Sequence, residues 1–128
     1  MARILVIDDQ AHVRAVILSV LRAKDHEVVG VSDGSSGLQE FKDTPFDLAI
    51  IDVYLPGIDG VKVIREMRTL AADLPIIAIS GVMLNDSDRT ALDIFANASD
   101  LADIACLKKP FRSSELLKAV DKVLAPAI

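Results

Sequence analysis

The chain has 128 residues, of which 52% are hydrophobic and 26% charged, and its mean hydropathy is +0.40. This length and composition fit one compact domain with a substantial core and exclude a disordered chain. The formal net charge of −5 at pH 7 argues against a nucleic-acid-binding surface, which needs clustered Lys and Arg.

No membrane span or secretory signal is expected. The longest apolar runs fall well short of the ~18 residues that a transmembrane helix requires. The first run, 4–7, leads directly into two aspartates, which is unlike a signal peptide. The single cysteine, Cys106, cannot form an internal disulfide, so the sequence predicts a protein of the reducing cytoplasm.

Short apolar runs alternate with amphipathic segments five times, which is the pattern of a parallel sheet with crossover helices. We expect strands at 4–7, 28–31, 47–51, 76–79 and 104–107. We expect helices over about 11–24, from 34 to before Pro45, over about 61–70, around 92–96 and from about 113 to 124. The second strand has polar flanks and should lie at an edge. Because no linker, repeat or low-complexity tract interrupts the pattern, residues 1–128 are expected to form a single domain.

Acidic residues follow two of these apolar runs. Asp8 and Asp9 end the first run, and Asp52 ends the run 48–51. Carboxylates at the ends of parallel strands lie at the edge of the sheet where open α/β folds bind ligands. A strand order of 2-1-3-4-5 would make the first and third strands neighbours and bring the three carboxylates together. Oxygen ligands of this kind suit Mg²⁺.

Four elements in order carry a family resemblance. They are the Asp8-Asp9 pair, Asp52 within the stretch DVYLPGIDG, Ser80 at the end of the fourth strand, and the Lys-Pro-Phe segment 109–111. From Arg3 to about Leu124 the chain resembles the receiver domain of bacterial two-component response regulators. The resemblance implies a doubly wound α/β fold of the CheY-like (flavodoxin-like) type, with a five-stranded parallel sheet in the order 2-1-3-4-5 and five helices.

The resemblance also implies a magnesium site. Asp9 and Asp52 would bind Mg²⁺ directly, Asp8 mostly through water, and the backbone carbonyl of Tyr54 would supply a further ligand.

The same resemblance implies a phosphoryl site. Asp52 would be the phosphoacceptor, while the Lys109 ammonium and the Ser80 hydroxyl would each contact a phosphoryl oxygen. The Lys109–Pro110 peptide bond would be cis.

The implied function is phosphorylation-dependent signalling. The donor would be a sensor histidine kinase or a histidine phosphotransfer protein, and the output would be binding to a downstream protein. The protein would catalyse only its own phosphorylation and slow dephosphorylation, and so would not be an enzyme in the usual sense. Because no residues follow Ile128 for an output domain, a stand-alone receiver is expected.

Each motif also has a simpler interpretation. The Asp-Asp pair could cap the following helix, Asp52 could be a turn residue before the Pro-Gly loop, and Lys108 and Lys109 could be solvated. Ser80 could be an ordinary strand exit. The occurrence of these residues at the ends of four strands favours a shared site.

Two other functions remain open. The chain could be an interaction module of this fold that is never phosphorylated. It could also be a Mg²⁺-dependent phosphohydrolase with an aspartyl nucleophile, but such enzymes place a second acid two residues after the nucleophile, where this chain has Tyr54.

The chain departs from the receiver pattern at two places, Cys106 and the segment after Ser80, and its single tyrosine lies two residues after Asp52. Cys106 stands where the family usually has Tyr or Phe, so we expect altered signalling on the face formed by the fourth helix, fifth strand and fifth helix. The segment between Ser80 and Lys109 is longer than in chemotaxis-type regulators, which predicts an extended fourth helix or extended flanking loops. The Tyr54 ring could cover the site and slow hydrolysis of the phosphoryl group.

Overall fold

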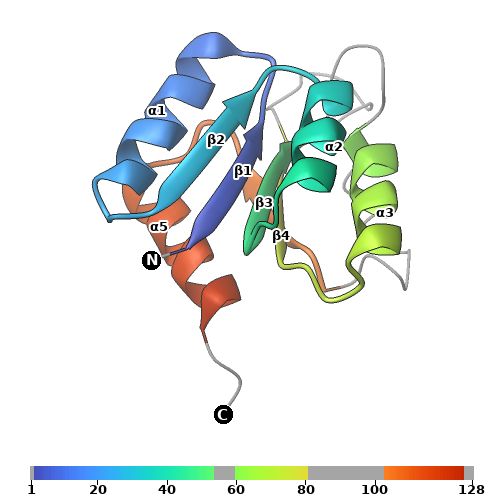
Figure 1. Ribbon diagram of the computed structural model, residues 1–128. Coiled ribbons are helices and arrows are strands. Elements are labelled where there is room, and N and C mark those ends of the chain that lie inside the picture. The colour runs from blue at the N-terminus through green and yellow to red at the C-terminus, as the bar shows by residue number, and fades with distance from the viewer. Residues whose placement is uncertain (1, 54–59, 81–102, 126–128) are drawn as a thin grey trace.

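The computed structural model describes residues 2–53, 60–80 and 103–125. Five parallel strands form one sheet, and helices cover both of its faces (Figure 1). The described elements are β1 (Arg3–Ile7), α1 (Ala11–Arg22), β2 (Glu27–Val31), α2 (Gly34–Asp43), β3 (Leu48–Asp52), α3 (Gly60–Leu70), β4 (Ile76–Ser80), β5 (Ala105–Lys108) and α5 (Ser113–Leu124).

The strand order is β2-β1-β3-β4-β5, which confirms the predicted topology and places β2 at an edge. The chain reverses its winding between β1 and β3. The two strands whose ends carry the aspartates are therefore direct neighbours, as predicted. The fourth of the five expected helices falls within 81–102, outside the described residues. No helix in the described part of the chain has both the length and the apolar character needed to cross a bilayer.

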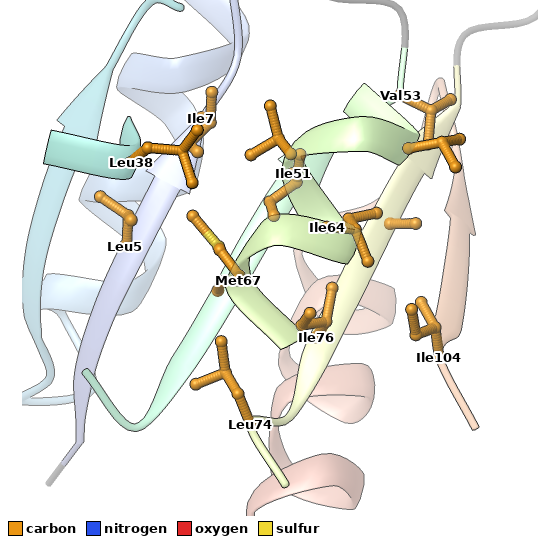
Figure 2. Close-up of a cluster of buried hydrophobic side chains, with 14 residues drawn as sticks. Leu5, Ile7, Leu38, Ile51, Val53, Ile64, Met67, Leu74, Ile76 and Ile104 are labelled. Atoms are coloured by element: carbon orange, nitrogen blue, oxygen red, sulfur yellow. The ribbon is translucent and has the colours of Figure 1, made fainter. Parts of the chain in front are cut away.

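The strands are buried because helices pack on both faces of the sheet. On one face, α1 and α5 contribute buried residues such as Ile17 and Leu116. On the other face, α2 and α3 contribute Leu38, Ile64 and Met67, which lie over β1, β3 and β4 (Figure 2). Every residue of β3 and β4 is buried, as expected for central strands of a parallel sheet.

Local sequence sets the helix ends near the predicted positions. Asp33 caps α2, because its carboxylate accepts a 2.7 Å hydrogen bond from the Ser36 N–H. The first helix ends at Arg22, two residues before the predicted end, and Asp25 follows in the left-handed region with φ of 65°. At α5, the Glu115 carboxylate accepts a 3.0 Å hydrogen bond from the Arg112 N–H.

Candidate functional site

The predicted carboxylates converge at the carboxyl edge of the sheet. The register pairs Ile7 of β1 with Ile51 of β3, so the aspartates that follow these residues lie next to each other. Asp8 is fully buried and Asp52 is 3% exposed, whereas Asp9 is exposed. One carboxylate oxygen from each lies within 4.8 Å of the others. We call these three residues the carboxylate cluster.

Asp52 is positioned by backbone packing as well as by its strand. It is the last residue of β3 and pairs with Ile79 of β4. The α3 helix begins at Gly60, directly against this strand end. A Cβ atom at position 60 would collide with the Asp52 carbonyl oxygen and the Val53 backbone. Glycine therefore allows α3 to approach the segment that carries Asp52.

Lys109 joins the carboxylate cluster from the far side of β4. Its backbone N–H donates a 2.8 Å hydrogen bond to the Ser80 carbonyl, which fixes the chain just after β5. Its Nζ lies 3.0 Å from Asp52 Oδ2 and 3.0 Å from Asp8 Oδ2. The Lys109–Pro110 bond is cis, as the resemblance implied.

The ammonium of Lys109 is held in its charged form. Burial by itself would lower the pKa of Lys109, but the contacts with Asp8 and Asp52 outweigh it, so this pKa lies above its usual value. The side chain therefore remains a cation at neutral pH and partly neutralises the carboxylate cluster.

Ser80 presents an unpaired hydroxyl. It is the last residue of β4 and is 4% exposed. Its Oγ is buried and makes no hydrogen bond to any described part of the chain. Buried polar atoms without a partner are rare in folded proteins, so this hydroxyl is available for an external acceptor.

Two contacts at the site were not predicted. The Gln10 Oε1 accepts a 2.7 Å hydrogen bond from Lys109 Nζ. Arg14 Nη1 donates a 2.7 Å hydrogen bond to the Asp8 carbonyl. One sequence signal could have pointed to Gln10: it precedes α1, where Ser, Thr, Asp or Asn is the usual residue.

Two predictions concern Tyr54, its carbonyl as a metal ligand and its ring as a cover over the site. Tyr54 lies outside the described residues, so both stay predictions.

Cys106 lies exposed on β5, three residues before Lys109. Its Sγ is 4.0 Å from the Ile104 carbonyl oxygen, and partial burial raises the pKa of the thiol. At neutral pH the thiol is therefore mostly protonated and poorly nucleophilic. The effect of this residue on signalling stays a prediction.

The donor set fits a hard divalent cation. The cluster offers only oxygen atoms, which Mg²⁺ prefers over nitrogen or sulfur. Three carboxylates against one ammonium leave an excess of two negative charges, the amount that a divalent ion neutralises. Asp8, Asp9 and Asp52 are the described residues that could hold it.

The model of the response regulator receiver domain family matches residues 4–121. Among curated relatives, the response regulator receiver protein CpdR of Brucella abortus is 29% identical over 131 residues, covering 99% of this chain and 100% of CpdR. The chemotaxis protein CheY of Bacillus subtilis is 29% identical over 123 residues, covering 95% of this chain and 97% of CheY. The regulatory protein VanRB of Enterococcus faecalis is 30% identical over 122 residues, but the chain spans only 52% of its length.

Solved structures show the same similarity. The chain resembles the response regulator TrrA of Thermotoga maritima, solved in complex with Mg(2+)-BeF, with TM-score 0.80 and 29% identity. The match covers 97% of this chain and 100% of TrrA. A putative response regulator of Chloroflexus aurantiacus matches with TM-score 0.81 and 31% identity over 98% of both chains. The chain therefore belongs to the response regulator receiver domain family of two-component signalling.

Proposed function

We propose that this protein is a Mg²⁺-dependent phosphoacceptor that receives a phosphoryl group on Asp52. The observation that carries the proposal is the placement of the Asp52 carboxylate, which is buried, 3.0 Å from the Lys109 ammonium and within the carboxylate cluster. A structural ion pair alone would not require two further aspartates at the same point. The unpaired hydroxyl of Ser80 on the neighbouring strand supplies a donor for the incoming group.

The reaction is a phosphoryl transfer. A carboxylate oxygen of Asp52 attacks phosphorus, the bond from phosphorus to the donor atom breaks, and the donor leaves with that electron pair. The Lys109 ammonium and the Ser80 hydroxyl neutralise and orient the equatorial oxygens of the transferring group. These side chains act by position and charge, which is what phosphoryl transfer chiefly requires.

Asp8, Asp9 and Asp52 would hold the magnesium ion. When bound, this ion supplies positive charge for the attacking carboxylate and for the transferring oxygens. The Mg(2+)-BeF complex of TrrA supports this assignment, because TrrA is similar to this chain over its full length.

The physiological donor in this proposal is a phosphohistidine of a sensor kinase or phosphotransfer protein. The output is regulated binding to a downstream protein, driven by a shift between two conformations of the domain. The protein is not an enzyme that turns over a separate phosphoester, because no acid follows Asp52 by two residues to act as general acid and base.

The test is incubation with acetyl phosphate, with Mg²⁺ or with EDTA, followed by intact-mass measurement. The proposal predicts one added phosphoryl group on the wild type with Mg²⁺ and none with EDTA. The Asp52→Asn variant should remain unmodified. The Asp121→Asn variant, which makes the same change at an exposed residue of α5, should behave as the wild type.

An unmodified wild-type protein under these conditions would favour a different function, an interaction module with the same fold and an idle site.

A further inference from the structure

We propose that Gln10 is a positioning residue for Lys109. Its side-chain carbonyl accepts a hydrogen bond from the Lys109 ammonium at the site. This hydrogen bond is kept when the ammonium exchanges a carboxylate oxygen for a phosphoryl oxygen as its other partner. This inference rests on the proposed phosphoacceptor function.

The Lys109 ammonium has three N–H donors, and three oxygens of the described residues lie close to it. It donates hydrogen bonds to Gln10 Oε1 at 2.7 Å and to Asp52 Oδ2 at 3.0 Å, and it forms an ion pair with Asp8 Oδ2 at 3.0 Å. The contact with Gln10 is the shortest of the three. Because an ammonium can only donate, it also fixes the amide of Gln10 with the oxygen facing Lys109.

The backbone of Gln10 is tied to the site independently of its side chain. Its N–H donates a 2.9 Å hydrogen bond to Asp8 Oδ1, and its carbonyl accepts a 2.9 Å hydrogen bond from the Arg14 N–H. The side chain therefore projects from a point that is fixed relative to the carboxylate cluster and to the first turn of α1.

Gln10 occupies the N-cap of α1 but does not cap the helix with its side chain. Ser, Thr, Asp and Asn are preferred at this position because their short side chains bond to the helix N–H groups. The Gln10 side chain instead spans to a residue 99 positions away in the chain. The residue at this position thus serves the site rather than the helix end.

The three oxygens differ in charge. Asp8 holds the ammonium by an ion pair and Asp52 by a charge-assisted hydrogen bond, and both are needed elsewhere in the proposed reaction. Gln10 is neutral and takes no other part in that reaction. Its bond can therefore persist while the ammonium exchanges a carboxylate for a phosphoryl oxygen, which limits the space that the long lysine side chain must search.

Two variants of equal side-chain length separate this role from a structural one. Gln10→Met keeps the reach but removes the acceptor, whereas Gln10→Glu keeps both the reach and an acceptor. Gln39→Met is the matched control, because Gln39 is an exposed glutamine of α2 whose side chain donates a local hydrogen bond to Asp43, four residues along the same helix.

The first readout uses magnesium-free protein and requires no phosphorylation. NMR of the Lys109 ammonium protons should show exchange with water about three- to tenfold faster in Gln10→Met, as expected for loss of one hydrogen bond. Exchange in Gln10→Glu and in Gln39→Met should match the wild type or be slower.

The second readout is the rate of phosphorylation by acetyl phosphate with saturating Mg²⁺. The rate should fall about three- to tenfold in Gln10→Met and stay unchanged in Gln39→Met.

The two readouts together decide the proposal. If the ammonium protons of Gln10→Met exchange with water at the wild-type rate, the contact is overturned. If they exchange faster but the phosphorylation rate is unchanged, the positioning role is overturned. If the wild type itself is not phosphorylated, the proposed function fails, and the positioning role fails with it; the exchange readout then still reports separately on the contact itself.

Discussion

Charged side chains pair at both ends of the sheet, but in different surroundings. At the amino edge, Arg3 and Glu27 lie 3.4 Å apart and their side chains are 30% and 58% exposed. Also at that edge, Arg68 forms a bidentate ion pair with Asp103, whose side chain is 68% exposed. At the carboxyl edge, the Lys109 side chain is 13% exposed and its partners almost fully buried.

This difference separates stabilising pairs from functional ones. Exposed ion pairs contribute about 0.2–1 kcal/mol each and cost little to form. A buried pair loses hydration that its attraction repays only in part, so it is weak evidence for stability. The buried charges at the carboxyl edge therefore add little net stability to the fold. Their concentration there is consistent with a site arranged for chemistry.

The largest expected effect is that of breaking the buried pair. In magnesium-free buffer, Lys109→Met should lower the free energy of unfolding by about 3 kcal/mol, because it removes the ammonium that forms ion pairs with the buried carboxylates of Asp8 and Asp52. The neighbouring Lys108 is exposed, so Lys108→Met should stay within about 0.5 kcal/mol of the wild type. Urea unfolding in EDTA measures the free energy of unfolding of both variants. Equal free energies for Lys109→Met and Lys108→Met would remove the distinction between the two edges.

A second test concerns backbone packing at the carboxyl edge. Gly60→Ala should lower the free energy of unfolding by about 2 kcal/mol, because the added methyl group meets the backbone of Asp52 and Val53. The methyl group of Gly30→Ala meets mainly the flexible side chain of Leu18, so this control should change stability by less than about 0.5 kcal/mol.

The Gly60→Ala variant should also be phosphorylated more slowly, because its helix α3 must move away from the strand end that carries Asp52. If the Gly60→Ala variant is less stable but is phosphorylated at the wild-type rate, the position of Asp52 does not depend on this close approach.

A smaller effect is expected at the amino edge. Arg68 lowers the pKa of Asp103, first through their hydrogen bonds. Asp103→Asn should cost only about 0.5 kcal/mol near pH 7, since the exposed carboxylate is screened by solvent. A lowered pKa means that this stability is present above the usual pKa of aspartate and is lost as the pH falls through the folded-state value.

Stability curves of the wild type and Asp103→Asn should therefore converge at acidic pH and in high salt. A difference that persists in acid would assign the effect to packing rather than to charge.

The smallest effect is expected at Cys106. Because partial burial raises the pKa of its thiol, alkylation by iodoacetamide near pH 8 should be several-fold slower in the native protein than in urea. The rate in the native protein should keep rising at more alkaline pH. Native alkylation as fast as in urea would indicate an activated thiol and a role that the fold does not suggest.

The fold and the main site residues could be predicted because each depends on local sequence. The runs before Asp8 and Asp52 are apolar enough to be central strands. Right-handed crossovers allow few strand orders, and the order 2-1-3-4-5 was favoured among them because it brings the carboxylates together and because the family resemblance implies it. Asp52 was expected just after its strand and is its last residue, a difference of one position at the boundary. The carboxylates were found because polar residues ending buried strands are conspicuous.

The role of Gln10 could not be predicted in this way. Its partner Lys109 is 99 residues away, and two strands, β3 and β4, lie between the strands that precede these residues. Nothing in the local sequence specifies which long side chain spans that distance to reach the ammonium. The unpaired state of the Ser80 hydroxyl likewise depends on its three-dimensional surroundings. Such contacts follow from register and side-chain reach, which a one-dimensional pattern does not contain.

The most direct test of the central claim is to locate the phosphoryl group. After reaction with acetyl phosphate and Mg²⁺, borohydride reduction converts an acyl phosphate of aspartate to homoserine, which peptide mass spectrometry identifies. The account predicts homoserine at position 52 alone, and none when EDTA is present. Homoserine at position 8 or 9, or modification at position 52 that persists in EDTA, would contradict it.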